Sequence, residues 1–371
     1  MMSARFLTVV LERAFNMRDG FGREIDYMRI SVIDSCNLNC YYCNPCDNNE
    51  HCHALNILSV KEVLCIVRAA TRLGIKHFRL TGGEPLLHPQ LDEIVLQIKK
   101  IPGVSSVSLT TNAVLLVQHA KWLKEAGIDS INVSLDTIDA SEYERITKKP
   151  LLEEVKNGIN AAIECGIRVK INVVLTPQTD VVALTRYVAK KGTDIRFIEM
   201  MPVGEGHTNG VEPYKKVIGT LSKLYGEPCR INTEKTKEIN SGNDKRKIPD
   251  NGPAEYYIFP ELGIRVGLIQ AIHGKFCDTC NRIRVTADGR LMPCLGSSVT
   301  MDLVPDSWDF ADDVEKDFAI VRALRAAIKA KPRCHNFNDN AVTYTKTTET
   351  KTTEIEAAEV NAARNMSRIG G

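Results

Sequence analysis

The sequence has almost no net charge and lacks any long hydrophobic run. Its 371 residues include 48 Lys and Arg against 46 Asp and Glu, which leaves a formal net charge of +2. Such a balance gives no bulk attraction to nucleic acid or to a membrane, so we expect neither as a partner and look for any polyanion site in a local cluster of charges. No stretch reaches the roughly 18 apolar residues of a membrane span. Glu12 and Arg13 break the short apolar patch near the start, unlike a signal peptide, and we therefore expect a cytoplasmic protein.

What the sequence does contain is a regular alternation of short apolar segments and amphipathic ones. The expected strands cover residues 28–33, 76–80, 104–110, 130–135, 168–175 and 195–200, and the expected helices cover residues 60–73, 89–100, 114–126, 151–165 and 181–191. Strands that alternate with helices predict parallel pairing through right-handed crossovers. Six strands are too few for a closed eight-fold barrel, so we predict an α/β fold built on a partial, TIM-like (βα)6 barrel.

The alternation stops after Met201, which suggests a second, smaller unit. Four further strands are expected at residues 254–259, 264–269, 282–286 and 291–294, with a hairpin at Asp288-Gly289 and a helix over 321–330. We therefore divide the chain into an N-terminal extension (1–24), the barrel (25–214), a C-terminal α+β domain (215–337) and a tail (338–371). The biased composition of residues 343–359 implies no function.

The first cysteine group, Cys36, Cys40 and Cys43, directly follows the first expected strand. A loop this tight can turn three thiolates toward one metal centre, one fewer than usually hold a [4Fe–4S] cluster. The iron left without a protein ligand would be free to bind something else. The alternative is a zinc site that takes its fourth ligand from a nearby residue, for which the candidates are Cys46, His51, Cys52 and His53.

A second group, Cys277, Cys280 and Cys294, repeats this arrangement in the C-terminal domain. A CxxC pair followed by a third cysteine on the next strand indicates a metal site. A structural zinc ribbon, in a binding protein with no enzymatic activity, is one interpretation. Two three-cysteine sites in one chain favour an iron–sulfur cluster at each, so we predict that the C-terminal domain carries a second cluster.

The segment Gly82-Gly83-Glu84-Pro85 comes directly after the second expected strand. Glycines at such a place allow close approach of the backbone to a ligand, and positive φ angles. Glu84 could accept a hydrogen bond from an ammonium group. In barrel folds of this kind the chemistry lies at the C-terminal ends of the strands, where this segment falls.

Basic residues also gather near the expected strand ends. Arg282 and Arg284 are two positions apart on one strand and therefore project from the same face. Guanidinium groups suit phosphate oxygens. The candidates for an anion site are Arg29, Arg79, Lys170, Arg282 and Arg284.

With these motifs the chain resembles the radical S-adenosylmethionine (SAM) superfamily and, within it, the GTP 3′,8-cyclase family (molybdenum cofactor biosynthesis protein A). The resemblance covers about residues 25–337 and the last six residues. Ala113 departs from it, because the family usually has glycine after Thr-Thr-Asn. The resemblance rests on residues 29–43, 79–85, 110–112, 131–136, 170–172, 196–202, 252–254, 276–285, 294 and 366–371.

The resemblance implies a role for each cysteine group. Cys36, Cys40 and Cys43 would hold a [4Fe–4S] cluster whose open iron binds SAM, and reductive cleavage of SAM would give a 5′-deoxyadenosyl radical. Cys277, Cys280 and Cys294 would hold a second [4Fe–4S] cluster in contact with the guanine of GTP. The residues implied to bind SAM are Tyr42, Gly83, Ser134 and Met201; those implied to bind GTP are Arg29, Arg79, Thr110, Lys170, Arg282 and Arg284.

The implied activity is that of a radical SAM lyase of molybdenum cofactor (molybdopterin) biosynthesis. The radical would remove the ribose 3′ hydrogen of GTP, and the 3′ carbon would attack C8, giving (8S)-3′,8-cyclo-7,8-dihydroguanosine 5′-triphosphate. Arg282, Arg284 and the terminal Gly370 and Gly371 would support catalysis. Expected partners are GTP, an external electron donor and the next enzyme of molybdopterin synthesis, with the chain a monomer or a homodimer. A peptide-modifying radical SAM enzyme with an auxiliary cluster is the alternative.

Overall fold

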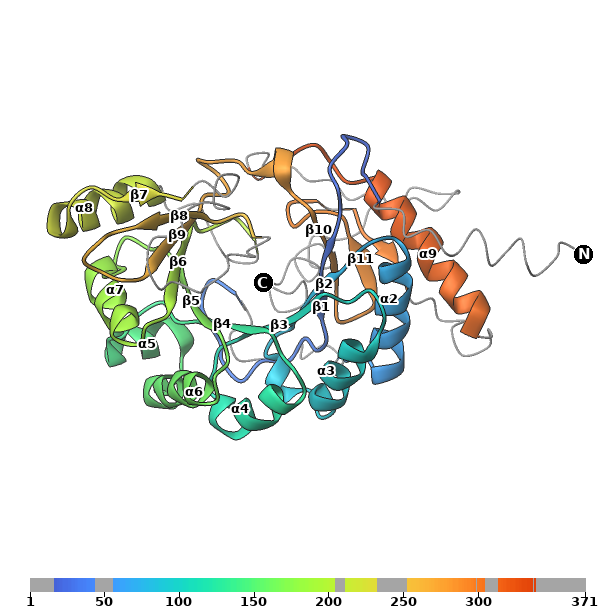
Figure 1. The fold of residues 1–371 in the computed structure, drawn as a ribbon, viewed down its shortest axis with the longest axis horizontal. Helices are drawn as coiled ribbons and strands as arrows, with labels where there is room; N and C mark the ends of the chain where they lie inside the picture. Colours follow the sequence, from blue (N-terminus) through green and yellow to red (C-terminus); the bar gives the residue numbers. More distant parts are fainter. Residues whose placement is uncertain are drawn as a thin grey trace, which may run out of the picture.

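The strands of the protein form one twelve-stranded sheet that curves into an open arc, with helices along its outer side (Figure 1). The structure is a computed structural model that describes residues 17–43, 56–203, 211–231, 252–297, 299–303, 313–335 and 337. Within these residues the strand order is β12-β11-β10-β1-β2-β3-β4-β5-β6-β9-β8-β7. The long parallel centre of this sheet confirms the predicted partial, TIM-like barrel.

Six consecutive parallel strands make up the centre of the sheet, as predicted. They are β1 (Tyr27–Ser31), β2 (His77–Thr81), β3 (Ser106–Thr111), β4 (Ser130–Ser134), β5 (Val169–Val174) and β6 (Asp194–Ile198). The five expected crossover helices are α2 (Val60–Arg72), α3 (Leu91–Lys100), α4 (Leu116–Glu125), α6 (Leu152–Glu164) and α7 (Val181–Lys190).

Local signals explain where these helices begin. Ser59 and Glu62 form a capping box at α2, in which each side chain bonds to the other residue's backbone N–H. An additional helix, α5 (Ala140–Thr147), was not expected from the sequence. Asp139 caps it by accepting a hydrogen bond from the backbone N–H of Glu142, so its start did carry a signal.

The C-terminal half of the chain joins both edges of the six-stranded centre. The strand β10 (Arg282–Val285) pairs in parallel with β1, and β9 (Arg265–Ile269) pairs in parallel with β6. The sheet is therefore continuous across residue 214, where the division into two domains remains a prediction. The remaining elements are α8 (Gly219–Tyr225), β7 (Cys229–Arg230), β8 (Glu255–Ile258), β11 (Arg290–Met292), β12 (Met301–Asp302), α9 (Asp313–Lys329), and the short helices Pro85–Leu87, Tyr214–Ile218 and Cys277–Thr279.

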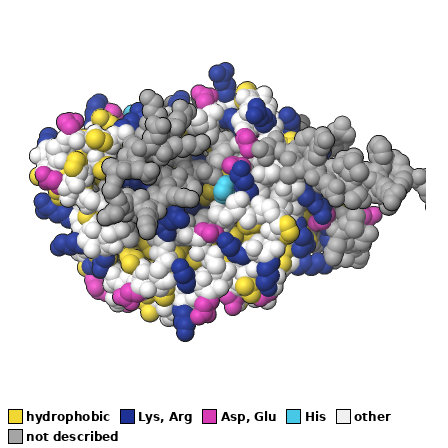
Figure 2. All heavy atoms as spheres, in the orientation of Figure 1, with side chains coloured by type: hydrophobic (Ala, Val, Ile, Leu, Met, Phe, Trp, Pro, Cys, Tyr) yellow, Lys and Arg dark blue, Asp and Glu magenta, His cyan; other side chains and the backbone are white. Residues whose placement is uncertain are grey.

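The hairpin predicted at Asp288-Gly289 is confirmed, because β10 and β11 pair in antiparallel fashion around Gly289, whose φ is 75°. Acidic and basic side chains are interspersed over the described part of the face in Figure 2, in keeping with the low net charge. No helix of the described part of the chain is long and apolar enough to cross a membrane. Several residues of the sequence analysis lie outside the described residues: Cys46, His51, Cys52, His53, 343–359, Gly370 and Gly371.

Candidate active site

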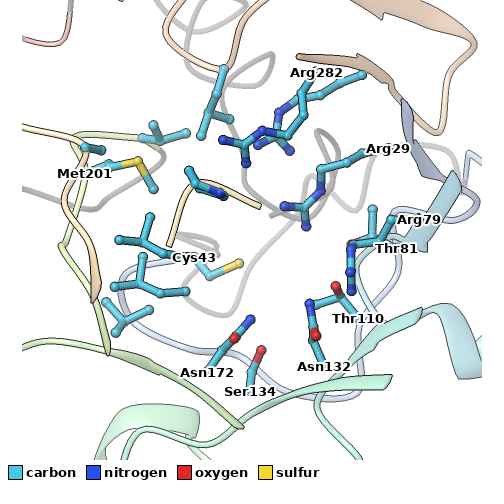
Figure 3. A pocket seen from close by; sticks show the side chains of 18 of the residues that line it. Arg29, Cys43, Arg79, Thr81, Thr110, Asn132, Ser134, Asn172, Met201 and Arg282 are labelled. Atoms are coloured by element: carbon cyan, nitrogen blue, oxygen red, sulfur yellow. The ribbon is translucent and has the colours of Figure 1, made fainter. Parts of the chain in front are cut away.

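A cavity of about 320 Å³ lies inside the curved sheet, toward the carboxyl ends of the parallel strands (Figure 3). All six cysteines of the two predicted metal sites line it. We call Cys36, Cys40 and Cys43 the first cluster site, and Cys277, Cys280 and Cys294 the second cluster site. The fold thus brings two cysteine groups, more than 230 positions apart in the sequence, to one cavity.

Arginines from three neighbouring strands form one row across the cavity wall. Arg29 of β1 is in register with Arg79 of β2 on one side and with Arg284 of β10 on the other. Residues in register on adjacent strands project from the same face, so the three side chains share one wall. Arg282 is two residues before Arg284 on the same face, and Figure 3 shows Arg29, Arg79 and Arg282 pointing into the same space.

This arginine row holds positive charge in a buried place. Burial lowers the pKa of Arg29 well below its usual value, and the charge of Arg284 lowers it further. Burial and the charge of Arg282 lower the pKa of Arg284 to about 10. Both lowered pKa values show that burial and neighbouring positive charge destabilise the charged forms of these guanidinium groups. An anion bound beside them would stabilise those forms. Several guanidinium groups at one wall therefore make a site for a multiply charged, phosphate-like ligand.

Two other side chains that line the cavity carry polar atoms suited to a ligand. Within the described residues, Thr110 Oγ1 and Asn132 Oδ1 are buried and have no hydrogen-bond partner. Buried polar atoms of native proteins are nearly always hydrogen-bonded, so these two fit a site that a polar ligand completes. Asn132 is a residue that the sequence analysis missed. Its position two residues before Ser134, on the same face of β4, was the available signal.

The loop of the first cluster site is held by neighbouring elements. The backbone N–H groups of Asn39 and Tyr41 donate to the carbonyls of Thr147 and Ile146 at the end of α5. The Tyr42 hydroxyl donates to Asp136 Oδ2 at 2.5 Å, just after β4. The unexpected helix α5 therefore serves to position this cysteine loop.

Gly82 and Gly83 allow the turn after β2 to pack closely against this same loop. A Cβ on Gly82 would lie 2.5 Å from the Ile33 carbonyl oxygen, and one on Gly83 would lie 2.2 Å from that of Ser35. Neither glycine has a positive φ, so that part of the prediction is wrong. Their lack of a side chain lets the end of β2 run directly against the backbone that leads into Cys36.

Glu84 forms its hydrogen bonds with groups of the chain itself, whereas the sequence alone suggests an acceptor for an ammonium group. Its carboxylate accepts hydrogen bonds from the backbone N–H of Leu86 at 3.0 Å, the hydroxyl of Thr111 at 2.7 Å and the backbone N–H of Asn112 at 2.7 Å. Burial raises its pKa to about 7. Glu84 therefore ties the end of β2 to the end of β3 behind the cavity.

Ala113 occupies a backbone conformation that favours glycine. Its φ is 65°, in the left-handed region, and the residue is fully buried. Glycine adopts this conformation without strain, which gives a physical reason for the glycine usual at this place in the resembling family.

The second cluster site is framed by hydrogen bonds from outside the sheet. Arg23 donates to the Cys277 carbonyl oxygen at 2.6 Å, and Lys331 donates to the carbonyl oxygens of Arg282 at 2.7 Å and Pro293 at 2.8 Å. The N-terminal segment and the residues that follow α9 thus hold the peptide groups next to the three cysteines.

Of the predicted site residues that the structure describes, all but Lys170 line the cavity. Lys170 lies on the same face of β5 as Asn172, but nearer the start of the strand, and it is not part of the cavity lining. Its Nζ lies 5.9 Å from the centre of the Tyr256 ring. The predicted residues that line the cavity, besides the six cysteines, are Arg29, Tyr42, Arg79, Gly83, Thr110, Ser134, Met201, Arg282 and Arg284.

The two sites each offer three thiolates, one fewer than usually hold a [4Fe–4S] cluster. Each thiolate of such a cluster binds a different iron, so three thiolates leave one iron open to another ligand. The residues of both sites therefore suit two such clusters.

Comparison with known proteins first gives the class. Residues 30–183 match the Radical SAM superfamily, and residues 193–337 match Molybdenum Cofactor Synthesis C. The crystal structure of Streptococcus suis SuiB superposes with a TM-score of 0.54, covering 81% of this chain and 68% of that one. At 15% identity this likeness shows the fold alone. The class is thus a radical SAM protein whose C-terminal half is of the molybdenum-cofactor type.

Curated relatives then narrow the class to one family. The GTP 3′,8-cyclase of Clostridium perfringens (strain SM101 / Type A) is 35% identical over 324 residues, which is 86% of this chain and 95% of the relative. The GTP 3′,8-cyclase of Pelotomaculum thermopropionicum is 36% identical over 327 residues, with the same two coverages. The chain belongs to the GTP 3′,8-cyclase family.

Proposed function

We propose that this chain converts GTP to (8S)-3′,8-cyclo-7,8-dihydroguanosine 5′-triphosphate in molybdenum cofactor biosynthesis. The reaction takes place in the cavity between the two cluster sites, with SAM at the first site and GTP at the second.

The observation that carries this proposal is the row Arg79–Arg29–Arg284 on the cavity wall. A triphosphate brings several negative charges, and forked guanidinium donors in a place of low dielectric bind such a group strongly. A triphosphate concentrates its charges on three adjacent phosphorus centres, whereas the carboxylates of a peptide are spread along its chain. The compact row therefore favours the nucleotide over the peptide-modifying alternative.

The chain's own residues would hold the two clusters and SAM as follows. Cys36, Cys40 and Cys43 bind the first [4Fe–4S] cluster, and Cys277, Cys280 and Cys294 bind the second. When bound, the first cluster and SAM supply a 5′-deoxyadenosyl radical that removes a hydrogen atom from the substrate. SAM lies against Tyr42, Gly83, Ser134 and Met201, all of which line the cavity.

The remaining residues position GTP. The arginine row and Arg282 bind the triphosphate, and the hydroxyl of Thr110 and the amide of Asn132 bond to polar groups of the nucleotide. Because the phosphates are fixed at one wall, the ribose is presented to the first cluster site at a set distance, which is the main requirement of a hydrogen-atom transfer. Lys170 would contribute to GTP binding from β5, on the same face as Asn172 and nearer the start of the strand. Gly370 and Gly371 would support catalysis from the end of the chain.

The reaction also needs partners outside the cavity. An external electron donor would supply the electron needed at the first cluster site, and the next enzyme of molybdopterin synthesis would take the product. The chain would work in the cytoplasm as a monomer or a homodimer.

The test is anaerobic reconstitution with iron and sulfide, followed by incubation with a reductant, SAM and GTP. We expect about eight iron atoms per chain, as two [4Fe–4S] clusters require, and release of 5′-deoxyadenosine that depends on GTP. Cleavage of SAM at the same rate with and without GTP would contradict the proposed substrate.

A further inference from the structure

One histidine of the cavity wall carries a buried nitrogen that the described chain leaves without a hydrogen bond. His335 follows α9 and lines the cavity together with Phe337. Its Nε2 lies 2.7 Å from the carbonyl oxygen of Ala271, and a carbonyl can only accept, so Nε2 carries the proton. Nδ1 is then the acceptor of the neutral ring. It is buried and has no partner among the described residues, which fits a place that a ligand completes.

The His335 ring is uncharged and fixed in position. Burial lowers the pKa of His335 below its usual value, so the neutral form prevails at neutral pH. The ring centre lies 4.1 Å from that of Phe337, with the two planes inclined at 33°. A Cβ on Gly296 would lie 2.6 Å from the His335 Cβ, so the glycine makes room for this packing. An acceptor that is already held in one orientation loses little freedom when a ligand binds to it.

His335 stands directly beside the second cluster site. Its backbone N–H donates to the sulfur of Cys277. Ala271, whose carbonyl holds the ring, and Gly296, which follows Cys294 by two positions, line the same cavity. The Nδ1 acceptor therefore belongs to the part of the cavity in which we place the guanine base.

The arginine row cannot by itself select this base. It recognises phosphates, which all nucleoside triphosphates share. Selection of one base requires hydrogen bonds to the edge of its ring. Thr110 and Asn132, which also carry buried polar atoms without a partner, lie on β3 and β4 in the middle of the sheet. Of these three residues, His335 is the one whose backbone bonds to a cysteine of the second cluster site.

Guanine offers what a lone pair at this place requires. Its N1–H and its 2-amino group are hydrogen-bond donors on one edge, each next to an acceptor (O6 or N3) that could face the open iron. At the same two places adenine presents the lone pair of N1 and a C–H group. An adenine base in the same position would therefore leave the buried His335 Nδ1 without a donor, which is the situation in which buried polar groups discriminate most strongly.

We propose that His335 Nδ1 accepts a hydrogen bond from the N1–H or the 2-amino group of guanine, and that this bond selects GTP over ATP. The inference rests on the proposed function, because it needs GTP with its base at the second cluster site. It adds a residue that reads the base to the arginines that hold the phosphates.

Nucleotide binding to the reconstituted full chain tests the proposal. The Kd values for GTP and ATP are measured anaerobically by equilibrium dialysis, without reductant, for the unaltered chain and for His335→Gln. The glutamine Nε2 can still donate to the Ala271 carbonyl, but no acceptor remains at the position of Nδ1. We expect the unaltered chain to bind GTP about tenfold more tightly than ATP, or better, and His335→Gln to lose most of this preference through a higher Kd for GTP.

Two further variants and one further nucleotide sharpen the measurement. In His335→Asn the amide oxygen can take the place of Nδ1, so this variant should bind GTP more tightly than His335→Gln. His119→Gln, on α4 and outside the cavity lining, is the matched control and should bind all nucleotides as the unaltered chain does. ITP keeps N1–H but lacks the 2-amino group. Binding of ITP as tight as that of GTP would assign the bond to N1–H, and binding as weak as that of ATP would assign it to the amino group.

The outcomes separate this inference from the proposed function. An unchanged preference for GTP in His335→Gln, or an equal loss in His119→Gln, would overturn the inference and leave the proposed function standing. Loss of iron from His335→Gln, measured against about eight atoms in the unaltered chain, would also overturn it, because the residue would then serve the cluster and not the base. Equal binding of GTP and ATP by the unaltered chain would contradict the proposed function itself.

Discussion

The two cluster sites use the same three ligands in opposite electrostatic surroundings. At the first site burial raises the pKa of Cys36 to about 11, with a further contribution from the charge of Glu84. At the second site burial also raises the pKa of Cys280, but the charges of Arg282 and Lys331 outweigh it and lower the pKa to about 7. One site is therefore set against carboxylates and the other against cations.

This difference matches the two molecules that we propose for the cavity. SAM carries a sulfonium and an ammonium charge, and carboxylates lie behind the first site. GTP carries a triphosphate, and guanidinium groups surround the second site. The cavity is thus polarised, which orients two charged ligands relative to each other before any chemistry occurs.

The largest expected effect comes from removing one cysteine from each site. Cys40→Ala should abolish SAM cleavage, because the cluster that binds and reduces the cofactor is lost. Cys280→Ala should leave slow SAM cleavage that GTP no longer stimulates. In both variants the iron content should fall from about eight to about four atoms per chain. Loss of all iron from either variant would mean that the sites assemble as a unit, not independently.

Adding a single methyl group at Gly83 should also remove one cluster and leave the other in place. In Gly83→Ala the added Cβ would meet the Ser35 carbonyl, which we expect to displace the first cysteine loop at a cost of about 1–3 kcal/mol. Iron analysis should show only the second cluster. Gly219→Ala is the matched control, since nothing lies within 4 Å of its Cβ position and its φ is −60°. Full iron content in Gly83→Ala would show that the loop tolerates the displacement.

Thiol reactivity in the metal-free protein should differ sharply between the sites. At pH 7 about half of the Cys280 thiols should be ionised and very few of the Cys36 thiols, because their pKa values lie near 7 and 11. At pH 7 we therefore expect Cys280 to be alkylated roughly a hundredfold faster than Cys36, or more. Its rate should level off above pH 7, whereas that of Cys36 should rise toward pH 11. If the alkylation rates of Cys280 and Cys36 depended on pH in the same way, the two sites would not differ in their electrostatic surroundings.

Loss of one arginine should weaken GTP binding without changing either cluster. Arg284→Ala removes charge-assisted hydrogen bonds to phosphate, each worth about 1.5–3 kcal/mol, so the Kd for GTP should rise roughly 10- to 100-fold. Equilibrium binding and iron analysis measure the two effects separately. Arg325→Ala, on the exposed side of α9, should change neither. If Arg284→Ala lost iron, the arginine would be structural.

Much of the fold follows from local sequence, but the pairing of distant strands does not. The six central strands and five crossover helices were visible in the apolar periodicity. The pairing of β10 with β1 and of β9 with β6 joins segments far apart in the sequence, and periodicity carries no information on such partners. A continuous sheet across residue 214 could therefore not be foreseen.

The candidate site, too, could be predicted only as far as its residues are grouped in the sequence. The six cluster cysteines were found because each group of three is closely spaced along the sequence or across one hairpin. Asn132 was missed because only folding shows that its side chain lines the cavity. Gly83 was correctly singled out, although the backbone that it accommodates belongs to Ser35. Glu84 appeared to be a ligand residue from its position, but its three hydrogen bonds to the chain become visible only in three dimensions.

The most direct test of the central claim follows one hydrogen atom across the cavity. The reconstituted protein is supplied with SAM, a reductant and GTP deuterated at the ribose 3′ carbon. If SAM at the first site faces the ribose of GTP held by the arginine row, the 5′-deoxyadenosine formed should carry one deuterium atom, as mass spectrometry will show. Unlabelled 5′-deoxyadenosine in the same amount would contradict the account, because the radical would then have taken its hydrogen from elsewhere.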